Sequence, residues 1–472
     1  MEEEDFESTR DEQNQIQHSI ARYEEMLRNK DAYFFDVDVF LNIVDFYIEK
    51  NDPVKALQVI EFAKQQHPGS IEFLLREAQL LSMVERHSEA LMILNNAEQL
   101  SPADPDVYMI RGSIYSQQQK FELAIENFNK AIPLATELDL LYLNIAYVYE
   151  SWGDYDKAIN YLKLCLDDNS DNEIALYELA FCFEFTERLS ESVAFYRQFI
   201  DRCPYSFPAW YNLGNVYNRT GDYEKALNAY DYCLLIKDDF SSAYFNKGNT
   251  LANLGRYGDA IECYKKTFEF EVPDALTYYN IGECYEQIEQ MQKARDYYKK
   301  STKLDGNLAE AWLGIGITLQ NEERWFESIH YFKKAIELNK EAAEFWFALG
   351  ESEYHLSNLV SAEIAYKKVI ILEPENLDIW LEYSHLLMMD DRADEAIEQI
   401  NTGLIYHPAQ AELLYRLVCY QYSTGLHAQA YVTLEHALEK NVQLCHSLFE
   451  YAPSLENDKT ILHLIDLYKN KI

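Results

Sequence analysis

Asparagine side chains at regular spacing are the residues of this sequence best suited to binding chemistry. Asn212, Asn246 and Asn280 lie 34 residues apart, and each directly follows an aromatic residue. An amide side chain both donates and accepts hydrogen bonds, so amides spaced along one surface can pair with the backbone of an extended polypeptide. The pattern therefore indicates noncovalent binding of a peptide segment.

Catalytic and metal-binding motifs are not found in the sequence. It contains no glycine-rich phosphate loop, no G-x-S-x-G nucleophile motif and no H-E-x-x-H zinc motif. None of the eight cysteines belongs to a C-x-x-C pair. His355, His385 and Cys419 recur at repeat-like spacing and could bind a metal together, but scattered residues of these types more often serve packing. We expect no enzymatic activity, no cofactor, no metal and no small-molecule substrate.

A period of 34 residues organises residues 37–444. Written in twelve rows of 34 from Val37 onward, the sequence aligns without an insertion. Large apolar residues at row positions 4, 7 and 11 share one helical face, as do those at positions 20, 24 and 27. Position 8 is glycine in six rows, and position 20 is small in all twelve. The residues at position 20 are Ala56, Ala90, Ala124, Ala158, Ser192, Ala226, Ala260, Ala294, Ser328, Ala362, Ala396 and Ala430.

Each row therefore predicts two amphipathic helices that pack face to face where the small residues lie. One such pair cannot bury both of its faces, so the rows must stack into an all-α solenoid. Residues 1–36 are expected to form an acidic segment and a capping helix over Asp11–Asn29, with residues 1–10 frayed. Residues 445–472 are expected to form a truncated repeat and a C-terminal capping helix.

The row containing Ala209–Asn215 (AWYNLGN) and Gly221–Ala226 (GDYEKA) closely resembles the tetratricopeptide repeat consensus. The resemblance covers residues 37–444, although Val44 and Val418 replace the small residue of position 8 near the two ends. It implies a right-handed superhelix of helix-turn-helix repeats. It also implies a concave groove lined by positions 2, 5, 6, 9, 12 and 13 of the first helix of each repeat.

The groove positions of this sequence define a predicted peptide-binding site. Its amide-rich centre is similar to the groove of the O-GlcNAc transferase repeat domain, without a catalytic domain. Asparagine at positions 6 and 9 is also near-consensus for the family, so a structural role is the alternative. The predicted site residues are Asn144, Tyr177, Tyr211, Asn212, Asn215, Phe245, Asn246, Asn249, Tyr279, Asn280, Tyr354, His385, Met388 and Tyr422.

The C-terminal part of the predicted groove is richer in methionine and aromatic residues. Methionine adapts its shape to varied partners, so this part suits an apolar or helical ligand. The alternative is that the chain's own tail packs over these residues.

The charge of the chain limits the partners it can bind. It has 80 acidic and 41 basic residues, a net charge of −39. We expect no binding to nucleic acid or membrane, because both are polyanionic surfaces. A basic protein ligand is permitted, because acidic residues outnumber basic ones at the groove positions. The acidic start of the sequence is unlike a signal peptide, and no apolar stretch reaches the length of a membrane span. We expect a cytoplasmic protein.

The sequence thus predicts a non-enzymatic scaffold or adaptor that holds protein or peptide segments in its groove to assemble a complex. The alternative is a structural, self-assembling solenoid whose surfaces mediate oligomerisation. The 37 tyrosines and 24 phenylalanines favour that alternative if many of them are exposed outside the groove.

Overall fold

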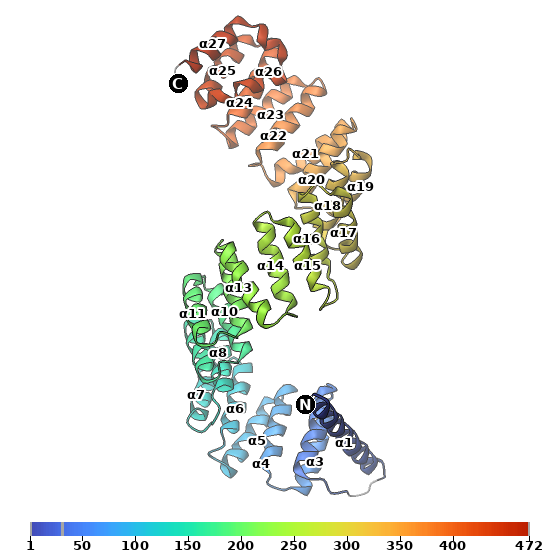
Figure 1. Ribbon diagram of the computed structural model, residues 1–472, viewed down its shortest axis with the longest axis vertical. Coiled ribbons are helices and arrows are strands. Elements are labelled where there is room, and N and C mark those ends of the chain that lie inside the picture. The colour runs from blue at the N-terminus through green and yellow to red at the C-terminus, as the bar shows by residue number, and fades with distance from the viewer. Residues whose placement is uncertain (1, 30–32, 471–472) are drawn as a thin grey trace. The chain divides into compact units, whose positions relative to one another are not determined.

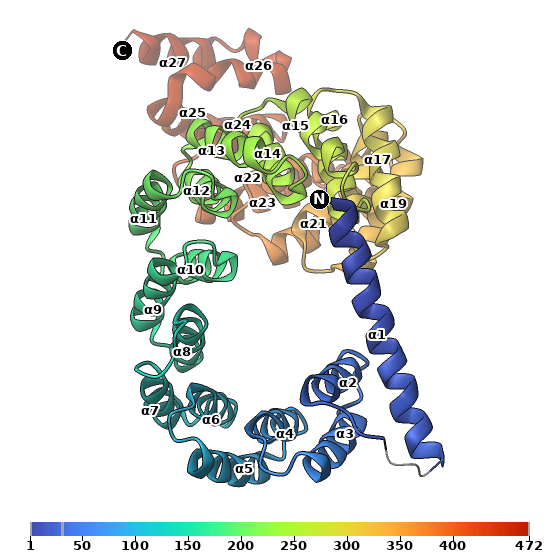
Figure 2. The ribbon, with the colours of Figure 1, turned by 60° about the horizontal axis from the view of Figure 1, so that its bottom comes forward.

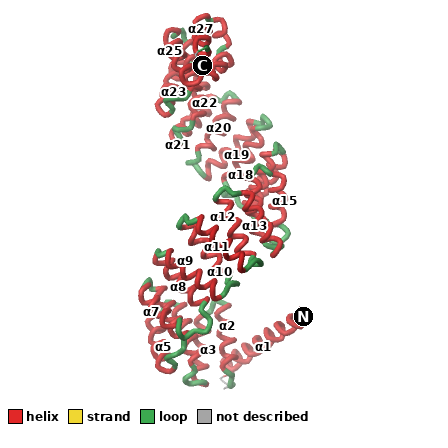
Figure 3. The backbone as a smooth tube through the Cα atoms, turned by 60° about the vertical axis from the view of Figure 1, so that its left-hand side comes forward, coloured by secondary structure: helices red, strands yellow, loops and turns green. Residues whose placement is uncertain are grey.

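The computed structural model describes residues 2–29 and 33–470, and that part of the chain contains helices and no strand (Figure 1). The helices follow one another in pairs joined by short loops (Figure 3). The chain divides into two compact units, residues 1–238 and 239–472. The prediction of an all-α solenoid built from stacked helix pairs is confirmed.

The N-terminal unit begins with α1 (Glu2–Asn29) and continues with six helix pairs. Its first helices are α2 (Val37–Glu49), α4 (Ile71–Met83), α6 (Pro105–Gln117), α8 (Asp139–Trp152), α10 (Glu173–Phe185) and α12 (Phe207–Arg219). Its second helices are α3 (Pro53–Gln66), α5 (His87–Leu100), α7 (Phe121–Ala131), α9 (Tyr155–Asp168), α11 (Leu189–Arg202) and α13 (Tyr223–Ile236).

The C-terminal unit holds six more pairs and a short tail. Its first helices are α14 (Ser241–Asn253), α16 (Ala275–Gln287), α18 (Ala309–Gln320), α20 (Ala343–His355), α22 (Leu377–Met389) and α24 (Ala411–Ser423). Its second helices are α15 (Tyr257–Thr267), α17 (Met291–Leu304), α19 (Trp325–Leu338), α21 (Leu359–Leu372), α23 (Ala393–Tyr406) and α25 (His427–Asn441). The tail comprises η1 (Val442–His446), α26 (Ser447–Tyr451), η2 (Pro453–Asn457) and α27 (Lys459–Lys469).

Helix α1 begins at Glu2 rather than at the expected Asp11. The expectation that residues 1–10 fray was therefore wrong for residues 2–10, while residue 1 lies outside the described residues. The acidic start of the sequence explains the longer helix, since carboxylates are favoured at a helix N-terminus.

The core of the central repeats is built on a close contact between repeat positions 8 and 24. Position 24 is aromatic in seven repeats, and in six of these the ring lies against a glycine at position 8, while the other five repeats have isoleucine or leucine at position 24. Tyr230 is fully buried, and a Cβ added to Gly214 would lie 2.6 Å from its ring. The same close approach occurs between Gly350 and Tyr366. The small residues at position 20 are fully buried in all twelve repeats. The two helices of a pair therefore approach closely because the sequence leaves room at these positions.

The turn between the two helices of every repeat uses a left-handed backbone at position 15. Glycine occupies that position in four repeats, at residues 153, 221, 255 and 425, as glycine at a helix C-terminus predicts. The other eight repeats place a side chain there, including Glu85 and Gln119, with φ near 60°. Packing of the two helices therefore imposes the turn even where the residue does not favour it.

Candidate protein-binding face

The first helices of the N-terminal unit lie on the inside of a curve and the second helices on its outside (Figure 2). Repeat positions 5, 6, 9 and 12 of the first helices supply the predicted binding residues. We call the surface formed by these positions the inner face of each unit. The second helices carry repeat positions 18, 22, 25, 26 and 29 on the opposite side, which we call the outer face.

The amide side chains of the inner face are used in part to hold the repeats together. Asn212 is only 2 % exposed, and its Nδ2 donates to the carbonyl oxygen of Leu176 in the preceding repeat at 3.1 Å. Its Nδ2 also lies 3.5 Å from the Tyr196 hydroxyl. Asn212 is therefore a packing residue. The prediction that a peptide backbone forms hydrogen bonds with this amide does not fit its burial.

Other predicted asparagines are partly exposed but also contact the protein. In the N-terminal unit the Tyr230 hydroxyl donates to Asn215 Oδ1 at 2.8 Å. Asn144 Nδ2 donates to the Leu140 carbonyl of its own helix at 2.8 Å. These bonds fit the structural alternative for positions 6 and 9, since each amide fixes its own helix or a neighbouring one.

In the C-terminal unit the same bond recurs one repeat later. The Tyr264 hydroxyl donates to Asn249 Oδ1 at 2.8 Å, and Asn280 Nδ2 lies 3.3 Å from that same oxygen. Asn246 is partly buried, and its backbone carbonyl accepts a hydrogen bond from the Thr250 hydroxyl. One accepting oxygen thus links a second helix to the first helix of the next repeat.

Replacing Asn212 with alanine should lower the free energy of unfolding by about 1–3 kcal/mol, because the buried Leu176 carbonyl and Tyr196 hydroxyl lose a partner. Asn144→Ala is the matched control, since Asn144 is partly exposed and bonds only its own helix; its cost should stay within about 0.5 kcal/mol. Urea denaturation followed by circular dichroism measures both. Equal effects of the two substitutions would contradict the packing role of Asn212.

Aromatic residues line both inner faces. In the N-terminal unit Tyr177 and Tyr211 have ring centroids 6.3 Å apart, and burial raises the pKa of the Tyr177 hydroxyl. In the C-terminal unit Phe245 lies 5.7 Å from the ring of Tyr264. Tyr279 lies 5.7 Å from Tyr298. These rings are partly exposed and give the faces apolar contact area for a polypeptide.

The inner face of the N-terminal unit also holds two neighbouring carboxylates that the sequence did not single out. Glu150 Oε1 accepts a hydrogen bond from Cys182 Sγ at 3.3 Å, and the Tyr147 hydroxyl donates to Glu178 Oε1 at 3.3 Å. Burial raises the pKa of Glu150 to about 7, and Glu178 adds to the shift. This face therefore carries a carboxyl group that changes charge near neutral pH.

The inner face of the C-terminal unit carries four carboxylates, of which three accept hydrogen bonds from neutral donors and the fourth, Glu382, lies near Arg416 without an ion pair. The Tyr279 hydroxyl donates to Glu283 at 2.7 Å and the Tyr298 hydroxyl donates to Glu286 at 2.8 Å. Gln320 Nε2 donates to Glu351 Oε2 at 3.0 Å. Burial raises the pKa of Glu283, Glu286, Glu351 and also of Glu382.

No lysine or arginine of the described chain lies within 4.0 Å of any of these four carboxylates. The contrast with Glu363 of α21 is clear, because Lys367 and Arg392 approach it at 2.7 and 2.8 Å. Hydrogen bonds from Arg392 and then Lys367 lower the pKa of Glu363 to about 2. The four inner carboxylates therefore lack the cationic partners that other glutamates of the unit have.

Aromatic and imidazole rings adjoin these carboxylates. The ring of Tyr354 lies 5.8 Å from that of His385, and His355 stacks on Trp325 with centroids 4.0 Å apart. Burial, with Arg416 as a second cause, lowers the pKa of His385, which favours its neutral form. Met388 is partly buried on the same helix. Rings beside carboxylates favour a cationic ligand, through cation–π contacts as well as charge.

The tail closes the inner face at the last repeat. The Tyr422 hydroxyl donates to Asp458 Oδ2 at 2.9 Å, and the ring of Tyr451 lies 3.4 Å from the guanidinium carbon of Arg416. Cys419 is 4 % exposed beneath Leu448. The alternative in which the tail packs over the C-terminal residues therefore holds for Tyr422, and the tail ring of Tyr451 also lies 6.5 Å from that of His385. Tyr354, His385 and Met388 stay partly exposed.

The sequence signal for the inner carboxylates was their charge alone. Many groove acids fall at position 2, where a helix N-terminus favours them, so counting acids does not separate a binding face from a capped helix. The separation depends on which partner each carboxylate meets. That information lies in the packing of neighbouring repeats.

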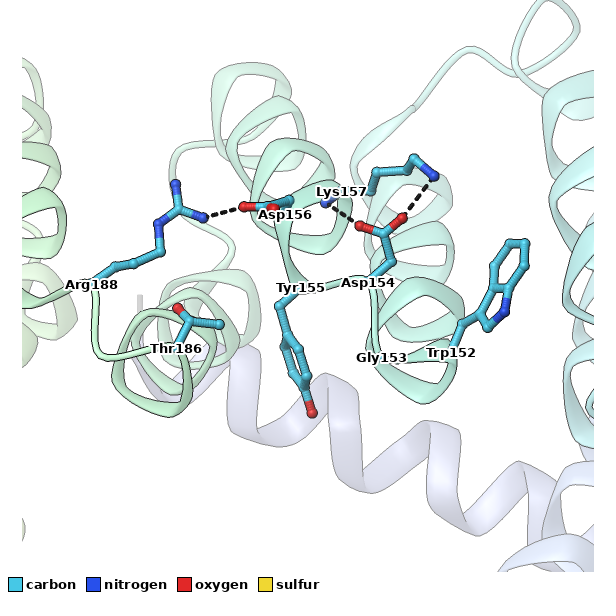
Figure 4. A pocket seen from close by; sticks show the side chains of 8 residues that line it. All are labelled: Trp152, Gly153, Asp154, Tyr155, Asp156, Lys157, Thr186 and Arg188. Atoms are coloured by element: carbon cyan, nitrogen blue, oxygen red, sulfur yellow. Dashed lines mark hydrogen bonds and ion pairs between the residues drawn. The ribbon is translucent and has the colours of Figure 1, made fainter.

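A separate pocket of about 560 Å³ lies at the turn between α8 and α9 (Figure 4). Asp154 forms an ion pair with Lys157 at 2.7 Å, and Asp156 forms one with Arg188 at 2.6 Å. Trp152 also lines the pocket and is 43 % exposed. The charged groups of this pocket form ion pairs with one another, so the pocket has fewer charged groups left to bind a ligand than the inner faces have.

Among the described residues, no group of three or more histidine, cysteine or acidic residues is placed to hold a metal ion. No described helix combines the length and apolar character needed to cross a membrane.

Comparison with protein families matches the tetratricopeptide repeat at residues 140–172, 207–240, 239–306 and 313–376. Residues 13–151 match the family described as ChAPs (Chs5p-Arf1p-binding proteins). No curated protein matches the chain.

Solved structures similar to this chain include three repeat proteins. YrrB, a TPR protein with an unusual peptide-binding site, is 22 % identical with a TM-score of 0.33, over 38 % of this chain and 92 % of its own. MamA is 21 % identical with a TM-score of 0.34, over 36 % and 92 %. A chain of the APC/C hetero-tetramer Cut9-Hcn1 is 14 % identical with a TM-score of 0.41, over 86 % and 93 %.

Stacked helix pairs with an inner face of amide, aromatic and acidic side chains define an α-solenoid repeat protein that acts as a protein-interaction scaffold. The chain contains tetratricopeptide repeats. The specific likeness of its groove to that of O-GlcNAc transferase stays a prediction.

Proposed function

We propose that the chain is a non-enzymatic cytoplasmic adaptor that binds a basic segment of a partner protein along α16, α18, α20 and α22. The observation that carries the proposal is the set of four inner carboxylates, Glu283, Glu286, Glu351 and Glu382, none of which forms an ion pair with a lysine or arginine of the described chain. A lysine or arginine side chain of the ligand would supply the charge that these carboxylates lack.

The raised pKa values give the energetic reason for such a ligand. Burial without a cation makes the charged form of each carboxylate less favourable, so part of its solvation energy is already lost before binding. A cation that binds there therefore gains more binding free energy than it would at a fully hydrated carboxylate. The neighbouring rings of Tyr354 and His355 add cation–π or stacking contacts, and arginine uses both.

The excess negative charge of the whole chain supports the same ligand. Long-range attraction raises the rate at which a basic segment meets the protein, and added salt weakens it. A backbone that runs along successive first helices would also meet partly exposed amides such as Asn280. Charge then selects the segment, and hydrogen bonds with its backbone hold it extended.

A binding titration of the full chain with a fluorescent lysine- and arginine-rich peptide tests this proposal. The variant Glu283→Gln/Glu351→Gln/Glu382→Gln should bind the peptide at least about tenfold more weakly, since three charge-assisted contacts become neutral. The matched control is Glu262→Gln/Glu269→Gln/Glu337→Gln, which removes the same charge from the outer face of the same unit. Fluorescence anisotropy at fixed salt measures both.

Two results would reject a dedicated basic site. One is equal weakening by the two triple variants, which would show that only bulk charge matters. The other is no preference of the wild-type chain for the basic peptide over a neutral peptide of the same length. Circular dichroism confirms that each variant keeps its helices.

The match of residues 13–151 to the ChAPs family supports a second candidate. That family's name describes proteins that bind Chs5p and Arf1p. In this candidate the first repeats of the N-terminal unit hold a protein partner of their own, on or beside the inner face of α2, α4 and α6.

The self-assembly alternative loses its main support. Tyr196, Tyr230, Tyr264, Tyr298 and Tyr366 are fully buried at position 24, where they fill the repeat cores. Among the described large hydrophobic residues that are well exposed, only four are tyrosines, Tyr205, Tyr232, Tyr406 and Tyr451. The tyrosine surplus therefore mainly builds the fold.

A further inference from the structure

A band of lysine pairs runs along the outer face of the C-terminal unit. Helices α15, α17, α19 and α21 each carry two adjacent lysines at repeat positions 25 and 26, beginning at Lys265, Lys299, Lys333 and Lys367. All eight are exposed or partly exposed. They lie in a chain with only 41 basic residues and a net charge of −39.

The repeat itself does not require these pairs. In the N-terminal unit the same two positions hold Glu61–Phe62, Asn95–Asn96, Asn129–Lys130, Lys163–Leu164, Arg197–Gln198 and Asp231–Tyr232, with no lysine pair among them. Both units form the same helix pairs. The lysine band is therefore a surface property of the C-terminal unit, added to a fold that forms without it.

Large apolar side chains stand beside the lysines. Phe326 of α19 is 80 % exposed, and Val360 and Ile371 of α21 are 75 % and 71 % exposed. Ile364, one helical turn after Val360, is also exposed. Exposed apolar side chains on adjacent second helices give this surface an area that water solvates poorly.

The positive charge of the band is only partly neutralised within the chain. Five of the eight lysines form ion pairs with glutamates, as Lys265 does with Glu262 at 3.1 Å and Lys334 with Glu337 at 3.0 Å. Exposed pairs of this kind contribute little and can exchange partners. Within the described chain no carboxylate lies within 4.0 Å of Lys299, Lys300 or Lys368. Lys300 Nζ instead lies 4.2 Å from the ring centroid of Tyr297.

We propose that this surface is a second interaction site, at which an acidic amphipathic helix of a partner protein docks. Its carboxylates pair with the lysines, and its apolar side chains, spaced by three or four residues, cover Phe326, Val360 and Ile364. The site is independent of the basic-segment site, because it lies on the second helices rather than the first. A chain with both sites bridges one basic and one acidic partner.

An acidic helix fits the surface better than other anionic partners do. A nucleic acid backbone would pair with the lysines but leave the apolar side chains between them uncovered. A second copy of the chain is the remaining alternative, and light scattering tests it.

Binding of a fluorescent acidic amphipathic peptide to the full chain tests the proposal. The wild-type chain should bind it in preference to a scrambled peptide of the same composition, and the affinity should fall with salt. Lys299→Gln/Lys300→Gln/Lys368→Gln should weaken binding about tenfold. The control Lys130→Gln/Lys163→Gln/Arg197→Gln removes the same charge at the same repeat positions of the N-terminal unit and should leave binding unchanged.

The proposal is overturned if neither peptide binds, if both peptides bind alike, or if the two triple variants weaken binding equally. It is also overturned if duplex DNA or phosphatidylserine vesicles bind more tightly than the acidic peptide at equal salt. Light scattering that shows self-association lost in the α17/α21 variant would assign the surface to a second copy instead. The basic-peptide titration with the same variant is expected to be unchanged, so failure at one site is distinguishable from failure at the other.

Discussion

Gly316→Leu is expected to lower the free energy of unfolding of the C-terminal unit by about 3 kcal/mol or more, because it overpacks a filled core. Gly316 lies on α18, and a Cβ added there would stand 2.3 Å from the ring of Phe332 on α19. Phe332 is fully buried, so its ring has no free space to move into. The two helices of the repeat must separate to admit the new side chain. Urea denaturation monitored by circular dichroism measures the loss.

Gly258→Ala is the control for this prediction. Gly258 lies in α15, and nothing stands within 4 Å of a Cβ added there. Alanine is the better helix former, so this variant should gain about 0.5–1 kcal/mol of stability. An unchanged unfolding midpoint for Gly316→Leu would mean that the helix pair can open at no cost, and would contradict the account of position 8 as the point of closest approach.

The small residues at positions 8 and 20 are the part of the fold that the sequence predicts best. Where the packing leaves no room for a side chain, the sequence has glycine or another small residue, and these residues recur every 34 positions, as at Gly214 and Gly350. Glycine at position 15, as at Gly153 and Gly221, indicates the left-handed turn directly. At Glu85 and Gln119 the same backbone is imposed by helix packing, and no local residue preference indicates it.

The binding face was predicted less well because its properties depend on contacts between repeats. Asn212 and Asn246 occupy the same repeat position, yet Asn212 is fully enclosed while Asn246 is partly exposed. The partners of Asn212, the Leu176 carbonyl and the Tyr196 hydroxyl, belong to the preceding repeat, so its burial cannot be predicted from one repeat alone. The Tyr422 hydroxyl likewise donates a hydrogen bond to Asp458, a tail residue that lies beyond the 34-residue repeats.

The carboxylates of the inner face show the same limit. Glu351 and Glu363 lie twelve residues apart in the same repeat, but only Glu363 meets cations. Burial without such a partner raises the pKa of Glu351, whereas hydrogen bonds from Arg392 and Lys367 lower that of Glu363. Composition gives both residues the same charge. Only their surroundings separate a carboxylate that stabilises the fold from one that is suited to bind a cation.

Trp380→Ala is expected to cost about 3–5 kcal/mol of unfolding free energy. Trp380 is 2 % exposed, its ring stacks on Tyr406 at 5.7 Å, and its indole N–H donates to the Pro374 carbonyl at 2.9 Å. Trp312 is the internal control, because it donates the same bond to the Gly306 carbonyl at 2.9 Å but is partly exposed. Its replacement by alanine should cost less, about 1–2 kcal/mol, since less apolar area returns to water.

Urea denaturation of the two tryptophan variants separates burial from the shared hydrogen bond. A larger loss for Trp380→Ala would assign most of the energy to the enclosed ring, and equal losses would assign it to the hydrogen bond and contradict the burial argument. The comparison also bears on binding, because Trp380 and Glu382 lie on the same helix, α22. Trp380→Ala should therefore weaken binding of the basic peptide only at urea concentrations where α22 begins to unfold. Glu382→Gln should weaken binding of the same peptide in the fully folded chain.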